Sequence, residues 1–103
     1  MEGWFIVSHK FLVHNVGDSV GVAIEDIEAG EQIQGVILED DSVVSVKSRD
    51  FIPLGHKIAL VDLDENSKVI EYRVPIGVTT KKIYKGSYVH THNLKTARWK
   101  YGE

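Results

Sequence analysis

Two histidines separated by one residue stand in the segment YVHTHNL at 88–94, near the end of the chain. Alternate side chains of a β-strand point to the same face, so a strand here would place His90 and His92 together, about 7 Å apart. Neutral imidazole is a common metal ligand, and histidine also transfers protons near neutral pH. The pair could therefore hold a metal ion, carry protons or line a polar cleft.

The rest of the sequence limits which of these kinds of site the chain could form. A closed metal site needs three or four ligands. His56 and His14 are the further candidates, but spacing alone does not show that they converge on the pair. The chain has no cysteine, which excludes disulfides and thiolate zinc sites. It also lacks the glycine-rich phosphate loops and the G-x-S-x-G nucleophile motif.

The elements that must position these histidines are predicted to be strands. β-Branched and aromatic residues dominate the apolar set, in short runs broken by Gly, Asp, Asn and Pro. This pattern predicts an all-β domain, with a hairpin turn at 62–70 and a short helix or a tail at 97–101. The predicted strands are 4–14, 20–27, 32–38, 42–48, 56–64, 68–77 and 88–94.

A short pattern, I-x-x-G-x-x-[IV], recurs at 27–33, 52–58 and 83–89. The segments 20–27 and 76–83, which lead into the first and third copies, also align with each other. The pattern describes a strand end, a tight turn and a new strand, in which glycine supplies a positive φ at little steric cost. It predicts pseudo-symmetric strand-turn-strand units, two of which lead into the candidate histidines.

Composition and charge exclude several classes of function. A chain of 103 residues is expected to form one domain, and its net charge of −3 argues against a nucleic-acid-binding surface. No apolar run approaches the roughly 18 residues that a membrane-spanning helix needs. The N-terminus lacks the pattern of a secretory signal peptide, so we expect a cytoplasmic protein.

Three segments, 13–31, 52–60 and 69–94, resemble the SAF domain of the altronate/galactarate dehydratase family. The resemblance rests on the combination of G-H-K-[IV]-A-L, Y-x-x-x-I-G and G-x-x-V-H-T-H-N. In that family the SAF domain is either the N-terminal part of a long sugar-acid dehydratase or a separate small subunit. The resemblance implies a β-clip fold, an all-β unit with pseudo-symmetric strand pairs, over residues 1–94. Residues 95–103 would then be a C-terminal tail or linker remnant.

The resemblance also suggests roles for individual residues. Sugar-acid dehydration removes a proton α to a carboxylate and expels a β-hydroxyl, and histidine suits both proton transfers. We therefore predict that His56, His90 and His92 are catalytic. The predicted substrate-binding residues are His14, Asp18, Ser19, Lys57 and Asn93. The sequence departs from the family at Ser19, where the family has Asn, and at Arg73, where it has Gly; these departures leave the substrate open.

No complete set of acid, base and metal is visible in a chain of this length. We therefore predict a dehydratase small subunit, inactive alone, whose histidine-bearing edge contributes to a site completed by a large catalytic subunit. That subunit would supply most ligands of any divalent metal, such as iron or manganese. Two alternatives stay open: the small subunit of a related lyase such as a sulfolactate sulfo-lyase, and a non-catalytic module that binds carbohydrate or a partner protein. Exposed edge strands favour self-association when the partner is missing.

Overall fold

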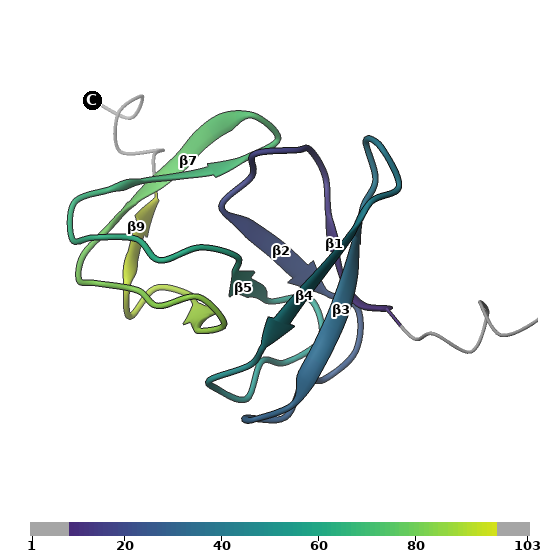
Figure 1. Cartoon of the computed structure of the whole chain (residues 1–103). Coiled ribbons are helices and arrows are strands. Elements are labelled where there is room, and N and C mark those ends of the chain that lie inside the picture. Colours follow the sequence, from purple (N-terminus) through teal and green to yellow (C-terminus); the bar gives the residue numbers. More distant parts are fainter. Residues whose placement is uncertain (1–8, 97–103) are drawn as a thin grey trace, which may run out of the picture.

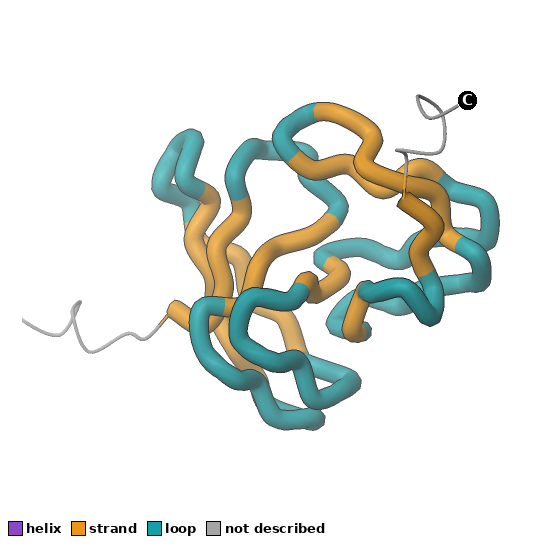
Figure 2. Tube along the Cα trace, turned by 180° about the vertical axis from the view of Figure 1, so that it is seen from behind, coloured by secondary structure: helices purple, strands orange, loops and turns teal. Residues whose placement is uncertain are grey.

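The structure is a computed structural model that describes residues 9–96, and it contains no helix among them. The prediction of an all-β domain is confirmed (Figure 1; Figure 2). The strands of the described region are β1 (His9–Val13), β2 (Val20–Ala23), β3 (Gln32–Ile37), β4 (Val43–Lys47), β5 (Lys57–Ala59), β6 (Lys68–Glu71), β7 (Val74–Thr79), β8 (Tyr88–Val89) and β9 (Leu94–Thr96). None of the described residues belongs to a helix that could cross a membrane.

These strands form two sheets, which lie beside each other in Figure 1. The larger sheet has the strand order β4-β3-β1-β2-β5-β8, and the smaller has the order β6-β7-β9. Neighbouring strands are antiparallel except β1 and β3, which run parallel. A buried cluster that includes Val20, Ala59, Val69 and Leu94 takes side chains from both sheets and so joins them.

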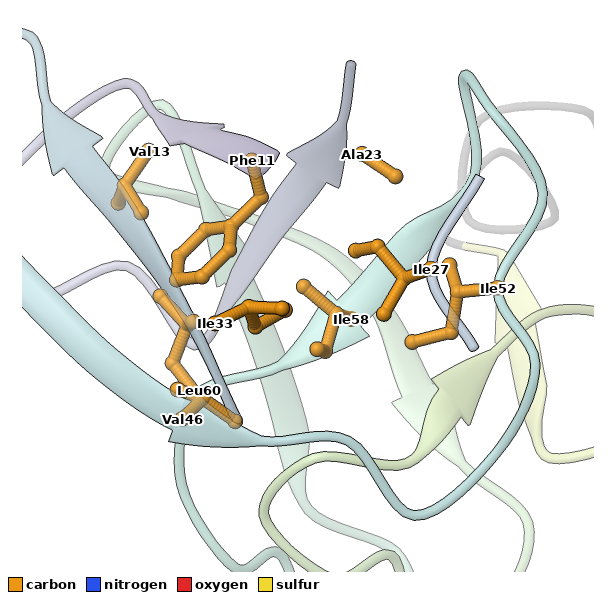
Figure 3. Close-up of a cluster of buried hydrophobic side chains, with 9 residues drawn as sticks. All are labelled: Phe11, Val13, Ala23, Ile27, Ile33, Val46, Ile52, Ile58 and Leu60. Atoms are coloured by element: carbon orange, nitrogen blue, oxygen red, sulfur yellow. The ribbon is translucent and has the colours of Figure 1, made fainter. Parts of the chain in front are cut away.

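A second buried cluster lies on the larger sheet around Phe11 (Figure 3). Phe11, Ile27, Ile52 and Ile58 are completely buried in it. Gly35 lies opposite Phe11 on the neighbouring strand, and a Cβ at this position would overlap the phenyl ring. The sheet therefore needs glycine at position 35 to bury this ring, whose burial stabilises the fold by about 2–3 kcal/mol.

The three predicted glycine turns are confirmed, because Gly30, Gly55 and Gly86 have φ of +87°, +87° and +92°. A fourth turn of the same form lies at 63–69, where Asn66 has φ of 66° in place of glycine. Asparagine is one of the few other residues that adopt this conformation readily. A template that requires glycine therefore misses the fourth copy.

The four turns associate in two pairs. Ile27 and Ile52 exchange two backbone hydrogen bonds of 2.9 and 2.8 Å, and Leu63 and Ile83 exchange two of 2.8 Å. An aspartate supports each pair in the same way, by accepting a backbone N–H from the partner turn. These bonds join Asp26 Oδ1 to the N–H of Leu54 and Asp62 Oδ1 to the N–H of Lys85. The chain therefore uses one architecture twice, which agrees with the predicted pseudo-symmetry.

Several predicted strands are wrong in part. The strands predicted at 20–27 and 56–64 end at Ala23 and Ala59. The segment 68–77 is a hairpin of β6 and β7, and its turn residues Tyr72 and Arg73 have φ of 58° and 63°. The strand predicted at 88–94 ends at Val89, because 91–93 form a turn. Asp18 of the β1–β2 loop stabilises the β6–β7 turn, and Asn93 stabilises the turn at 91–93. Residue types alone do not reveal either turn.

Other predicted boundaries also change. The turn at 62–70 is present, but it is not a hairpin, because it connects β5 and β6 of different sheets. β9 spans Leu94–Thr96, and the domain bounds predicted at 1–94 and 95–103 stay a prediction. The helix or tail predicted at 97–101 lies outside the described residues.

Gly86 and Gly30 offer a matched test of the turns, because both have positive φ but only Gly86 is crowded. A Cβ at Gly86 would overlap the carbonyl oxygen of Lys47, whereas a Cβ at Gly30 would meet nothing within 4 Å. We expect Gly30→Ala to lower the free energy of unfolding by about 1–2 kcal/mol, the cost of a left-handed alanine. Gly86→Ala should cost about 1–3 kcal/mol more because of the overlap. Urea denaturation measures both, and equal losses would show that the approach to Lys47 is not tight.

Candidate functional site

Three of the predicted histidines lie around the ring of Tyr88. The Tyr88 hydroxyl is 2.7 Å from Nδ1 of His56. The ring of His90 is stacked on Tyr88 with 5.6 Å between centroids, and the ring of His92 is tilted against it at 5.5 Å. His56 and His90 also meet edge to face at 5.0 Å. The structure thus brings together the three residues that we predicted to be catalytic.

His90 and His92 come together for a different reason from the predicted one. β8 ends at Val89, so the two histidines do not share one face of a strand. Instead, the side chain of Asn93 closes a turn around them. It accepts the N–H of His90 at 2.9 Å and donates to the carbonyl of Tyr88 at 2.8 Å. Asn93 is buried, so the structure gives it a role in shaping this turn, and its contact with substrate stays a prediction.

A pocket of about 420 Å³ opens beside this cluster, between the two sheets. The larger sheet and the residues that flank its strands contribute His56, Lys57, Val89 and His90 to the wall. The smaller sheet contributes Glu71, Ile76, Leu94 and Thr96. The pocket therefore combines proton-carrying and charged groups with an apolar floor, which is the usual composition of a ligand site.

Glu71 is the main polar group of the pocket that the sequence analysis missed. Its side chain is only 4% exposed, and its two oxygens lie 3.4 Å from Lys57 Nζ and 3.6 Å from His14 Nε2. His14 in turn stacks on Tyr72 with 3.9 Å between ring centroids. A signal was available, because Glu71 follows the apolar Val69 by two residues and so shares its inward face.

Asp18 and Ser19 hold the β6–β7 hairpin against the β1–β2 loop. The Asp18 carboxylate accepts the backbone N–H groups of Asn15, Tyr72 and Arg73 at 3.1, 3.1 and 3.2 Å. Ser19 Oγ accepts the N–H of Ile70 at 3.1 Å. Both residues are buried and neither lines the pocket. Their predicted contact with substrate therefore remains a prediction, beside a structural role that the geometry supports directly.

Comparison with known proteins places this arrangement in a family. The sequence matches the family described as "Altronate/galactarate dehydratase SAF domain" over residues 9–97. The chain belongs to this family. Its match therefore covers both sheets and every side chain of the candidate site.

The curated relatives of this SAF domain are of two kinds. A protein named "(2R)-sulfolactate sulfo-lyase subunit alpha" from Chromohalobacter salexigens is 43% identical over 94 residues, which are 90% of this chain and 100% of the relative. "Altronate dehydratase" from Bacillus subtilis is 38% identical over 92 residues, which are 89% of this chain and 16% of the relative. The protein of the same name from Escherichia coli is 35% identical over 79 residues, which are 77% of this chain and 15% of the relative.

The described residues of the SAF domain do not form a metal site on their own. Within 9–96 no three histidine, aspartate or glutamate side chains converge as a set of metal ligands. His56, His90 and His92 surround a tyrosine ring instead of a common point. A metal at His90 and His92 would need ligands from outside this region, so the predicted divalent metal stays a prediction.

The role of Asp18 can be tested by stability. Asp18→Ala leaves three backbone N–H groups of the two loops without their acceptor, which we expect to cost about 2–3 kcal/mol of unfolding free energy. Ser19→Ala is the matched control, because it removes one acceptor from the same hairpin and should cost about 1 kcal/mol. Urea denaturation gives both values. A loss for Asp18→Ala no larger than that for Ser19→Ala would contradict the assigned role.

The pair of Glu71 and Lys57 can be measured by a double-mutant cycle. Glu71→Gln removes the counter-charge of a Lys57 side chain that is 31% exposed, so we expect a loss of about 1–2 kcal/mol. Lys57→Met should remove most of that penalty, which gives a coupling energy near 1 kcal/mol. Thermal or urea unfolding of the four proteins supplies the cycle. Additive effects would mean that the two charges do not interact.

Proposed function

We propose that this SAF domain is the small subunit of a lyase that acts on a hydroxylated acid, and that its histidine-lined pocket is one half of the active site. The observation that carries the proposal is the placement of His56, Lys57, Glu71 and His90 around one pocket. The comparisons add support, because the chain spans the full length of a relative named as a subunit and 16% of a dehydratase.

The charges in the pocket favour a half-site over a complete one. A carboxylate substrate needs a positive group to receive it. Among the described residues that line the pocket, Lys57 carries the positive charge. A carboxylate oxygen of Glu71 lies 3.4 Å from Lys57 Nζ and offsets this charge. The pocket therefore has little net positive charge to offer an anion. A large subunit that brings a cationic residue or a metal ion to the open side would complete the site.

The chemistry that suits such a site is β-elimination. A base removes the proton α to the carboxylate, and the substituent on the next carbon leaves with its bonding electrons. The leaving group is hydroxide, taken up as water, in a sugar-acid dehydratase, and sulfite in a sulfolactate sulfo-lyase. Imidazole can act as base or acid in either reaction, because it gains and loses a proton near neutral pH.

Two substrate classes remain for the same pocket. The full-length match to a sulfo-lyase alpha subunit supports a sulfonated hydroxy acid. The family match and the partial match to altronate dehydratase support a sugar acid. Both require elimination next to a carboxylate, so the residue roles are the same and the partner subunit decides between the substrates.

Reconstitution tests the proposal. The chain is purified alone and together with a large lyase subunit, and each preparation is assayed on aldonates, aldarates and 3-sulfolactate. We expect turnover by the complex and none by either subunit alone. Turnover of any of these acids by the isolated chain would refute the half-site. Absence of turnover by every complex, with binding of one of these acids to the isolated chain, would favour a non-catalytic binding module.

Variants of the complex test the residues. His56→Ala and His92→Ala should each lower kcat by at least about a hundredfold, which is typical for loss of a group that transfers a proton or stabilises the charge that develops in the transition state. His9→Ala is the control, because His9 belongs to β1 and lies neither in the pocket wall nor in the group of rings around Tyr88, which includes His92. Full activity of His92→Ala would remove His92 from the site. A comparable loss with His9→Ala would show that the variants act through the fold.

A further inference from the structure

Tyr88 makes a hydrogen bond that determines where the proton of neutral His56 lies. Its hydroxyl is 2.7 Å from His56 Nδ1. We propose that Tyr88 is a positioning residue that donates to Nδ1 and thereby keeps the ring proton of neutral His56 on Nε2. The position of the proton follows from this geometry alone, and its consequence for catalysis rests on the proposed function.

The direction of the hydrogen bond follows from counting donors and acceptors. A neutral imidazole has one N–H and one bare nitrogen, whereas a tyrosine hydroxyl has a proton to donate near neutral pH. In residues 9–96 the Tyr88 hydroxyl has no acceptor other than His56. Donation by Tyr88 uses this proton, and it leaves Nδ1 of His56 as the acceptor. The reverse direction would leave the hydroxyl proton without an acceptor among the described side chains and backbone.

The backbone and ring of Tyr88 are held on several sides, so its hydroxyl is well placed. Its N–H donates to Oδ2 of Asp50 at 2.9 Å, and its carbonyl accepts from Nδ2 of Asn93 at 2.8 Å. Its strand β8 pairs with β5, where Tyr88 lies opposite Ile58. Its ring is nearly parallel to that of His90, with 10° between the two planes. These contacts are independent of His56 and would persist without the hydroxyl.

The position of this proton gives the histidines different chemical roles. His56 lines the pocket, and with Nδ1 engaged by Tyr88 only Nε2–H is free to meet a ligand. In this form His56 donates a hydrogen bond to an oxygen of the acid and cannot accept the α-proton. Another group would then act as the base, such as His90, which lines the same pocket, or His92, whose ring lies against Tyr88 outside the pocket wall. His56 would stabilise the negative charge that develops on the carboxylate oxygens.

Nuclear magnetic resonance of the isolated chain tests the proton position. The ring nitrogens of His56 are observed in ¹⁵N-labelled protein at a pH where the ring is neutral. We expect the Nε2–H tautomer to dominate in the wild type. Tyr88→Phe keeps the ring and removes the hydroxyl, and it should lower the ratio of Nε2–H to Nδ1–H by about fivefold, the factor contributed by one neutral hydrogen bond. Tyr84→Phe is the control, since Tyr84 is exposed and stacks with Arg49 and not with histidine.

The outcomes separate this inference from the proposed function. A dominant Nδ1–H tautomer in the wild type, or an unchanged ratio in Tyr88→Phe, would overturn the inference whether or not the complex has lyase activity. A shifted ratio in a complex with no activity would support the inference and count against the lyase. In an active complex, Tyr88→Phe should lower kcat about tenfold with little change in KM, because it weakens a transition-state contact. An unchanged kcat with a shifted ratio would remove His56 as the donor.

Discussion

The reciprocal backbone hydrogen bonds between paired turns are the constraint on which the rest of this domain depends. Ile27 bonds to Ile52 and Leu63 bonds to Ile83 in places where the neighbouring side chains are packed in the core. Buried N–H and C=O groups need partners, so each turn can be buried only with its mate. The turns at 52–58 and 83–89 lead directly into β5 and β8. The positions of His56 and Tyr88 are therefore set by the same bonds that close the core.

Part of this architecture could be predicted from the sequence, because three of the turns have a glycine at the same position of one repeated motif. A positive φ in a tight turn is costly for most residues, so three copies of the turn could be found from glycine spacing. The fourth turn has Asn66 at this position, so glycine spacing does not identify it. The turn at 91–93 was also missed, because it depends on hydrogen bonds from one buried amide, that of Asn93. Residue types predict where the chain can bend, and tertiary contacts decide where it does.

The candidate site could also be predicted only in part from the sequence. The histidines and Lys57 could be proposed from their chemistry, and the structure brings His56, His90 and His92 to one ring. Glu71 and Tyr88 were not proposed, because a carboxylate or an aromatic residue in a strand usually has an ordinary solvent or packing role. What distinguishes them is their contacts with residues of other segments. The ion pair of Glu71 with Lys57 joins the two sheets, and the bond of Tyr88 to His56 joins residues 32 positions apart in the sequence.

The contacts of Asp18 also bear on the order in which this chain folds. The bonds within each turn pair close loops of moderate length, whereas Asp18 reaches Tyr72 and Arg73 across 54 and 55 residues. Closing a longer loop costs more chain entropy, and contacts between distant residues slow folding. We therefore expect the paired turns to form early and the β6–β7 hairpin to dock on the β1–β2 loop late. The pocket between the sheets would then be among the last features to form, since its two walls meet only when that docking is complete.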